Sequence, residues 1–262
     1  MPPIHAIILG IIQGLTELFP ISSSAHLFII PWFFGWNYQS LPFDVALHLG
    51  TLLGLVAFLF SDWKAILGGL FRKEPYYVRL FFLIVIACIP GALFGVFLEK
   101  QAETVFRTPA LIALTMSAFA IILWLADTFC KKRKTIEDVS LLDAILIGLS
   151  QALAIIPGVS RSGATITAGL FLGMEKRESA RFSFLLATPI IAGAALWEGR
   201  KILSLGFQEP VALLLGFVSA AVASYFAVSF LLGYLRKGNF LPFVIYRFLF
   251  AIVILLVIIF KS

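Results

Sequence analysis

The sequence is short of charged residues. Only 13% of its 262 residues are Asp, Glu, Lys or Arg, whereas soluble domains average about 25%. This scarcity excludes a soluble globular protein, and nucleic acid is not an expected partner because the basic residues are dispersed over short connections. Cysteine is scarce as well. Cys88 and Cys130 stand alone without a CxxC pair, so we expect neither a cysteine metal site nor a redox site.

The first part of the chain lacks Lys and Arg, the earliest being Lys64. A signal peptide needs a positive N-terminal region, so we expect the first apolar segment to stay in the mature protein. Apolar residues are abundant instead, with 61% hydrophobic residues and a mean hydropathy of +1.02. These apolar stretches lack the alternation of barrel strands. The sequence therefore predicts an all-α polytopic membrane protein with one membrane domain, 1–262.

Apolar stretches of about 20 residues indicate membrane spans. Six candidates are 41–61, 80–98, 108–126, 182–197, 211–235 and 241–260. Two further apolar regions are broken: 4–34 by Pro20 and a serine run, and 144–173 by Pro157 and a following glycine. Proline ends or kinks a helix, and broken backbone at membrane depth must be buried in protein or line a cavity. Each region is therefore predicted to be a re-entrant helix–break–helix hairpin.

The two broken regions resemble each other. A shift of 138 residues aligns Gly10 with Gly148, Gln13 with Gln151, Leu15 with Leu153, Ser22 with Ser160, and Ser24 with Ser162. This predicts two repeats, about 1–135 and 136–262, each with one hairpin and three spans. An odd number of spans inverts one repeat relative to the other and places sites near the membrane midplane.

Positive charge favours this arrangement. The predicted connections 62–79, 127–143, 174–181 and 236–240 lie on one side and hold 4, 4, 3 and 2 Lys or Arg, which makes 13, and the other side holds 5. If the second broken region crossed the membrane, the division would become 11 to 7. The positive-inside rule favours the more uneven division, with both termini outside.

The first polar island, QGLTELFPISSSAH, carries Gln13 and Glu17 four residues apart. On a helix they share one face, and their oxygens could hold Mg²⁺ or Ca²⁺. Hydrogen bonds to neighbouring helices are the alternative. Because ionisable groups at membrane depth usually mark a functional site, we assign Glu17 a catalytic role and, together with Gln13, a metal-binding role.

Three serines and a histidine follow the first break. Ser22, Ser23 and Ser24 are suited to cap the next helix, and the same helix N-terminus could bind a phosphate. We predict phosphate binding for Ser22 and Ser24. Ser23 is a candidate nucleophile, and His26 is a candidate general base, general acid or nucleophile.

The second island, PGVSRSGAT, carries an arginine between two serines. Arg161 offers a planar fork to phosphate oxygens, and Ser160, Ser162 and Thr165 are predicted to bind phosphate beside it. The alternative is an ion pair between Arg161 and Glu17 without any ligand. The two islands together suggest a site for a phosphorylated lipid.

Three polar residues lie outside the islands. Asp44 and His48 share a helix face and are expected beside the site, whereas Arg247 is expected to have a structural role.

With these motifs the chain resembles the undecaprenyl-diphosphate phosphatase family, the integral membrane type also called bacitracin-resistance proteins. The similar stretches are Gln13 to Glu17, Pro20 to His26, Phe43 to Thr51, Pro157 to Thr165, and Ile245 to Arg247. Two departures are Gln13, where the family often has a glutamate, and Ala25, where glycine is common.

The resemblance implies hydrolysis of undecaprenyl diphosphate at the outer face of the bacterial cytoplasmic membrane, with a divalent cation. It also implies recycling of the lipid carrier for peptidoglycan synthesis, and bacitracin resistance. The nucleophile remains open between Ser23, His26 and water. A polyprenyl phosphate transporter is the alternative function, and the sequence leaves a homodimer open.

Overall fold

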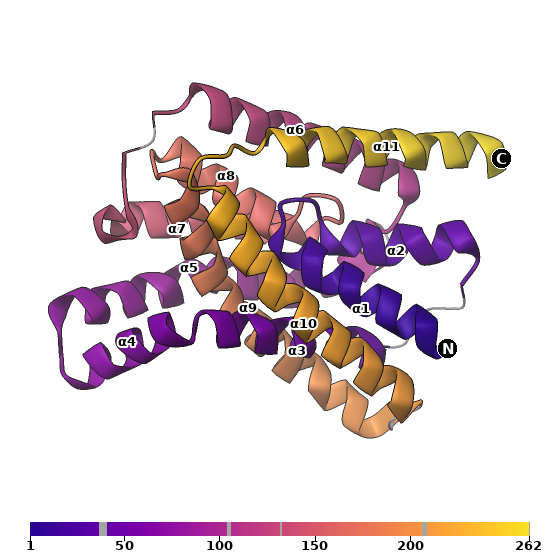
Figure 1. Ribbon diagram of the computed structural model, residues 1–262, viewed down its shortest axis with the longest axis horizontal. Helices are drawn as coiled ribbons and strands as arrows, with labels where there is room; N and C mark the ends of the chain where they lie inside the picture. Colours follow the sequence, from indigo (N-terminus) through magenta and orange to yellow (C-terminus); the bar gives the residue numbers. More distant parts are fainter. Residues whose placement is uncertain (37–40, 104–105, 132, 206–208, 262) are drawn as a thin grey trace.

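The computed structural model describes residues 1–36, 41–103, 106–131, 133–205 and 209–261. These residues form eleven α-helices and two short 3₁₀ turns (Figure 1). The helices are α1 (Pro3–Leu18), α2 (Ser23–Phe34), α3 (Leu41–Phe58), α4 (Phe60–Phe71), α5 (Pro75–Glu103), α6 (Pro109–Phe129), α7 (Leu141–Ala152), α8 (Arg161–Phe171), α9 (Lys176–Leu205), α10 (Pro210–Tyr234) and α11 (Leu241–Lys261), and the turns are η1 (Ile136–Asp138) and η2 (Leu153–Ile155).

Six of the described helices are long and apolar enough to cross a membrane: α3, α5, α6, α9, α10 and α11. They coincide with the six predicted spans, although α9 extends well beyond 182–197 at both ends. The all-α prediction is therefore confirmed, and the chain is a multi-pass integral membrane protein.

The connection predicted at 62–79 is wrong, because most of it is helical. Helix α4 follows α3 after the single residue Leu59, and α5 already begins at Pro75. No proline interrupts α4, and its Ile66 is buried against the neighbouring helices. Apolar burial of one face therefore makes this segment a helix although it carries charge.

Both broken regions are helix–break–helix pairs, as predicted. We call 19–22, between α1 and α2, the first break and 156–160, before α8, the second break. Each ends on a serine with positive φ: 73° at Ser22 and 74° at Ser160. Such angles are uncommon outside glycine. Two residues aligned by the sequence repeat thus share a rare backbone conformation.

The aligned helices also pack alike. Helix α1 runs along α10, and α7 runs along α5. A Cβ on Gly10 would stand 2.5 Å from the carbonyl oxygen of Gly216, and one on Gly148 would stand 2.6 Å from that of Ala87. A larger residue would clash at this distance. Glycine at the aligned position therefore lets α1 pack closely on α10 and α7 pack closely on α5.

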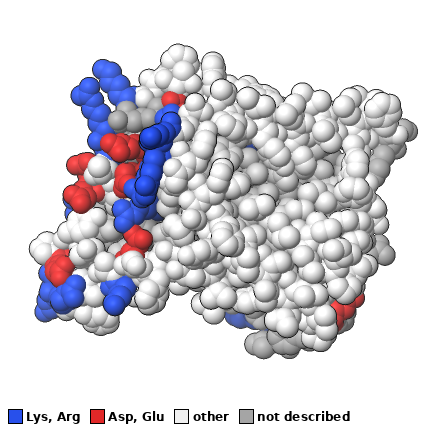
Figure 2. All heavy atoms as spheres, in the orientation of Figure 1, with Lys and Arg blue, Asp and Glu red and all other residues white. Residues whose placement is uncertain are grey.

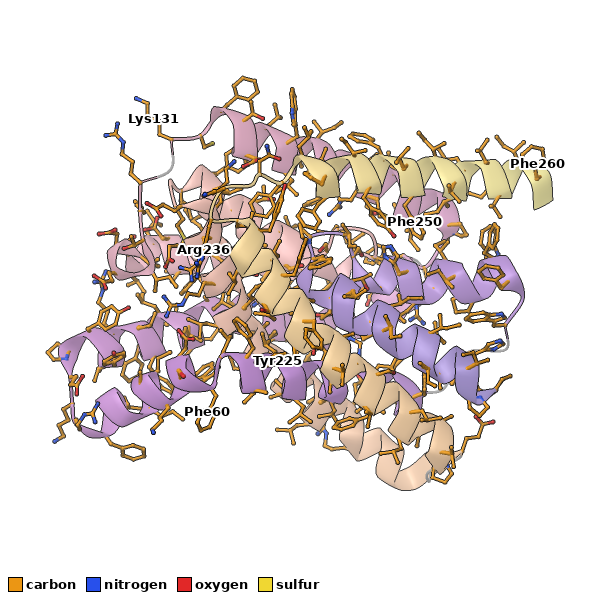
Figure 3. All side chains as sticks on the ribbon, in the orientation of Figure 1. Phe60, Lys131, Tyr225, Arg236, Phe250 and Phe260 are labelled. Carbon is orange, nitrogen blue, oxygen red and sulfur yellow. The ribbon has the colours of Figure 1, made fainter. Side chains whose placement is uncertain are left out.

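Charged side chains gather at one end of the molecule. Figure 2 shows them at the end where Figure 1 places α4 and the loop before α7, while most of the remaining face is uncharged. Lys131 and Arg236 lie at this end, whereas Phe60, Tyr225 and Phe260 are exposed apolar side chains (Figure 3). The side chains of four basic residues used in the charge comparison lie outside the described part: Lys100, Lys132, Lys201 and Lys261.

Candidate active site

An ion pair joins the two broken regions. Nη2 of Arg161, the first residue of α8, donates to Oε1 of Glu17 near the end of α1 at 2.9 Å. Only 9% of the Glu17 side chain and 13% of the Arg161 side chain are exposed. Two charges from the two polar islands therefore meet in the interior, as the pairing of these islands predicts.

Three further side chains converge on the other oxygen of Glu17. Ser23 Oγ donates to Oε2 at 2.5 Å and Gln13 Nε2 donates at 3.2 Å. His48 Nε2, from α3, lies 3.9 Å from the same oxygen. His48 is thus beside the site as expected, whereas Asp44 lines a separate cavity. Glu17 is the residue on which the site is centred.

His26 is turned away from this centre. Its Nδ1 lies 2.7 Å from the Ser22 carbonyl oxygen, and its Nε2 lies 2.6 Å from the hydroxyl of Tyr246. The ring stacks on Phe250 of α11 and is 2% exposed. Both ring nitrogens have partners outside the ion pair, which suits a positioning role better than attack on a substrate.

Most of the hydroxyl groups that the sequence predicts to bind phosphate form hydrogen bonds with other parts of the protein. Ser22 Oγ accepts from the Gly158 N–H at 3.2 Å, and Ser162 Oγ donates to the Phe19 carbonyl at 3.0 Å. In both hydrogen bonds a donor of the second broken region is bound by an acceptor of the first break. Ser160 Oγ caps α8, and Thr165 Oγ1 bonds to Ser183 Oγ. The exposed hydroxyl is that of Ser24, 3.2 Å from Ser22 Oγ.

Arg247 binds the backbone of both breaks. It is fully buried and donates to the carbonyl oxygens of Pro20 at 3.0 Å, Gly158 at 2.7 Å and Met116 at 3.0 Å. Pro20 and Gly158 are themselves aligned by the 138-residue shift. The expected structural role is therefore confirmed. A charged residue within an apolar stretch is the sequence signal that singles out Arg247. Its partners could not be predicted, because they come from three distant segments of the chain.

The start of α2 offers backbone donors. Ser22 precedes this helix but makes no side-chain capping bond to it within the described residues. The first N–H groups of a helix have no intrahelical acceptor and favour an anion. Because Ser23 is the first residue of α2, these donors lie beside the Glu17–Arg161 pair, as a phosphate site requires.

The residues around Glu17 fit a divalent cation that receives other ligands from its surroundings. Gln13 Oε1 is buried, and no described residue donates a hydrogen bond to it. No three His, Cys, Asp or Glu side chains cluster for a metal in the described part of the chain. Mg²⁺ commonly takes one or two protein oxygens and completes its shell with water and substrate phosphate. Gln13 and Glu17 can supply such a pair.

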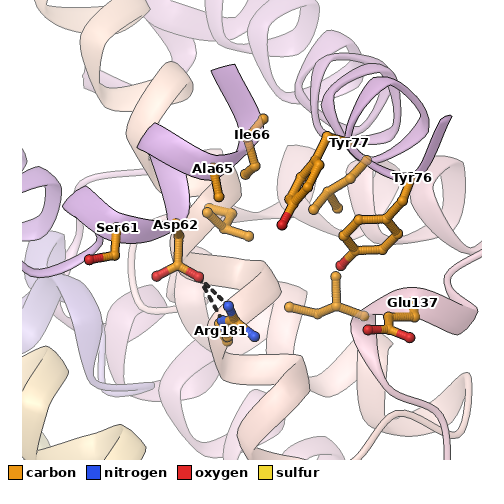
Figure 4. Close-up of a pocket in the computed structure, with 11 residues that line it drawn as sticks. Ser61, Asp62, Ala65, Ile66, Tyr76, Tyr77, Glu137 and Arg181 are labelled. Atoms are coloured by element: carbon orange, nitrogen blue, oxygen red, sulfur yellow. Dashed lines mark hydrogen bonds and ion pairs between the residues drawn. The ribbon is translucent and has the colours of Figure 1, made fainter. Parts of the chain in front are cut away.

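A polar cavity of about 390 Å³, separate from the Glu17–Arg161 site, lies at the charged end between α4, α5 and α9. Figure 4 shows Asp62 paired with Arg181 inside it, with Tyr76, Tyr77 and Glu137 around the space. None of the predicted catalytic residues lines it. Nε of Arg181 donates to Asp62 Oδ1 at 3.0 Å, so this pair ties α4 to α9.

Fold and site together define a polytopic helical membrane protein with an enclosed acid–hydroxyl–arginine site between two broken helices. The profile of the bacitracin resistance protein BacA family matches residues 6–253, and the chain belongs to this family.

Curated relatives agree with this assignment over nearly the whole chain. The chain is 52% identical to an undecaprenyl-diphosphatase of Moorella thermoacetica over 259 residues, which cover 98% of both chains. It is 49% identical to one of Pelotomaculum thermopropionicum, covering 94% of this chain and 93% of the relative. An undecaprenyl-diphosphatase of Caldicellulosiruptor bescii is 45% identical, with 97% of both chains covered.

Proposed function

We propose that this protein is an undecaprenyl-diphosphate phosphatase, which hydrolyses undecaprenyl diphosphate to undecaprenyl phosphate and inorganic phosphate. The observation that carries this assignment is the contact of Glu17 with both Arg161 and Ser23. An acid beside a hydroxyl and a guanidinium is an arrangement suited to phosphoryl transfer. The relatives named above carry the same activity in their names.

In the reaction we propose, Ser23 Oγ attacks the terminal phosphorus and Glu17 accepts the hydroxyl proton. The bond from that phosphorus to the bridging oxygen breaks, and undecaprenyl phosphate leaves. Water then hydrolyses the phosphoserine and releases phosphate. Arg161 and the N–H groups at the start of α2 stabilise the charge on the transferring group. Ser23 is only partly buried and touches the carboxylate, whereas both nitrogens of His26 are engaged.

We further propose a divalent cation, Mg²⁺ or Ca²⁺, held by Gln13 and Glu17. A diphosphate beside Glu17 brings like charges together in a site of low dielectric constant, where their repulsion is strong. Arg161 alone does not balance them. When bound, the cation supplies the missing positive charge, and the unpartnered Gln13 Oε1 supports its placement.

The two broken regions support an inverted repeat, with halves at about 1–135 and 136–262 and with both hairpins re-entrant. Aligned residues share positive φ and the same glycine contact, and two hydrogen bonds join the two broken regions. The charge distribution, 13 basic residues to 5, supports cytoplasmic placement of the charged end. The active site then opens to the periplasm or cell exterior, from which the protein recycles the carrier for peptidoglycan synthesis and confers bacitracin resistance.

Phosphate release distinguishes this function from transport of polyprenyl phosphate without hydrolysis. Purified protein in detergent should release inorganic phosphate from undecaprenyl diphosphate, and EDTA should abolish the release. A transporter has no need of a nucleophile and would release none. Reconstituted protein that moves the monophosphate across vesicles, while leaving the diphosphate intact in detergent, would establish the transporter instead.

A further inference from the structure

We infer that the prenyl chain of the substrate lies in an apolar groove between α5 and α9. This inference rests on the proposed function, because it takes a polyprenyl diphosphate as the ligand. The groove has a volume of about 520 Å³, which is within the range of small-molecule sites. Its walls are mostly hydrocarbon and small side chains, including Gly91, Gly95, Pro189 and Gly193, with Trp197 and the one charged lining residue, Glu198, on α9.

Two of the groove glycines face open space, whereas a Cβ on the third, Gly91, would stand 2.8 Å from Gln151 Nε2. A Cβ on Gly95 or on Gly193 would meet nothing within 4 Å. The interface between α3 and α10 is different, since a Cβ on Gly50 would stand 2.2 Å from the Phe217 carbonyl oxygen. Gly50 thus lets α3 and α10 pack closely. Gly95 and Gly193 instead leave a space between α5 and α9 that no described residue fills.

Both walls of the groove contain a proline within a helix, Pro90 in α5 and Pro189 in α9. A proline inside a helix removes one backbone hydrogen bond and favours a kink. Two prolines at the same level of facing helices favour local separation. A gap between spans that is lined by hydrocarbon suits a chain arriving sideways from the membrane.

Contacts on α9 link the groove to the active site. Cys88 lines the groove and its Sγ contacts the Leu186 carbonyl oxygen of α9 at 3.7 Å. Arg161 Nη1 contacts the carbonyl oxygen of Ser183, one helical turn earlier, at 3.5 Å. Residues three apart share a helix face, so Arg161 and the groove adjoin the same stretch of α9. A headgroup at Arg161 would leave its chain pointing into the groove.

A second apolar groove, of about 440 Å³, lies between α3, α9 and α10 and is the competing path. Leu49 and Phe217 line it. The close contact of Gly50 with Phe217 shuts the α3–α10 interface next to these residues. This groove is therefore closed on its α3–α10 side, whereas the groove between α5 and α9 includes Cys88, whose contact on α9 lies one helical turn from that of Arg161.

A bulky residue at an open glycine tests the inference. Gly193→Leu projects into the groove without a clash, and Gly233→Leu on α10 is the matched control, because its Cβ also meets nothing within 4 Å. Phosphate release is measured with undecaprenyl diphosphate and with isopentenyl diphosphate, whose single isoprene unit is too short to follow the groove. We expect Gly193→Leu to lower kcat/KM for the long substrate by about tenfold or more through misplacement of the chain. Its rate with the short substrate, and both rates of Gly233→Leu, should stay near wild type.

If Gly193→Leu affects both substrates equally, or affects neither, the prenyl chain does not lie in the groove between α5 and α9. Wild-type protein that releases no phosphate would instead refute the proposed function. Photolabelling separates these failures, because it needs binding but no turnover. A farnesyl monophosphate with a diazirine in its chain should label 85–96 and 189–198. Labelling of 42–49 and 210–217 without labelling of 85–96 would place the chain in the competing groove and contradict our inference, because α9 lines both grooves.

Discussion

Glu17 and Arg161 are 144 positions apart in the chain, and their side chains meet at 2.9 Å in the protein interior. Each belongs to a different broken region, so neither half of the chain contains the site alone. The first half contributes the carboxylate, the amide and the hydroxyl, and the second contributes the guanidinium. The proposed active site therefore needs both broken regions.

Ser23→Ala should abolish phosphate release, because it removes the proposed nucleophile and the hydroxyl that contacts Glu17. Ser117→Ala is the matched control and should retain most activity, since the Ser117 hydroxyl donates to the Ala113 carbonyl oxygen within its own helix, α6. A phosphoserine trapped by acid quench and located at Ser23 by mass spectrometry would confirm the route. Trapping at His26, or direct transfer of oxygen-18 from water to phosphate without a phospho-enzyme, would replace Ser23 by one of the other two candidates.

Arg247→Ala should destabilise the protein by ~3 kcal/mol or more, because it leaves buried carbonyl groups of both breaks without donors. Thermal unfolding in detergent measures this loss. Arg236→Ala, at an exposed arginine, should change the stability by less than about 0.5 kcal/mol. Equal stability of the two variants would show that Arg247 does not hold the breaks together.

Gln13→Glu should lower the Mg²⁺ concentration needed for half-maximal activity, because a second carboxylate strengthens a site for a hard cation. Gln13→Leu should raise it. Gln151→Leu changes the aligned glutamine of the second repeat and should leave the cation requirement unchanged. If cation titrations of all three variants coincide with that of the wild type, Gln13 is not a ligand.

Cysteine labelling tests the re-entrant topology. In protein whose native cysteines have been replaced by alanine, Ile4→Cys and Phe34→Cys at the two ends of the first hairpin should both react with an impermeant maleimide in intact cells. Leu142→Cys and Phe171→Cys of the second hairpin should react only after permeabilisation. All four native side chains are exposed. Reaction of position 171 but not 142 from outside would mean that the second broken region spans the membrane.

The sequence predicted the six spans and both breaks because membrane burial leaves long apolar runs and proline has a local effect. It also predicted the meeting of Glu17 with Arg161, since two charged groups at membrane depth require partners. Helix α4 was missed because its charged residues resemble a connection. The roles of Ser22 and Ser162 could not be predicted, because their partners belong to the opposite break. The hydrogen bond from His26 to Tyr246 spans 220 positions and has no local signal.

The most direct test of the central claim compares two acid–arginine pairs in the same protein, one buried and one partly exposed. Phosphate release from undecaprenyl diphosphate is measured for Glu17→Ala and Arg161→Ala, with Asp62→Ala and Arg181→Ala as matched controls from the charged-end cavity. The account predicts a loss of about 100-fold or more for the first two and rates within a few-fold of wild type for the controls. Near wild-type release by Glu17→Ala or Arg161→Ala would contradict it.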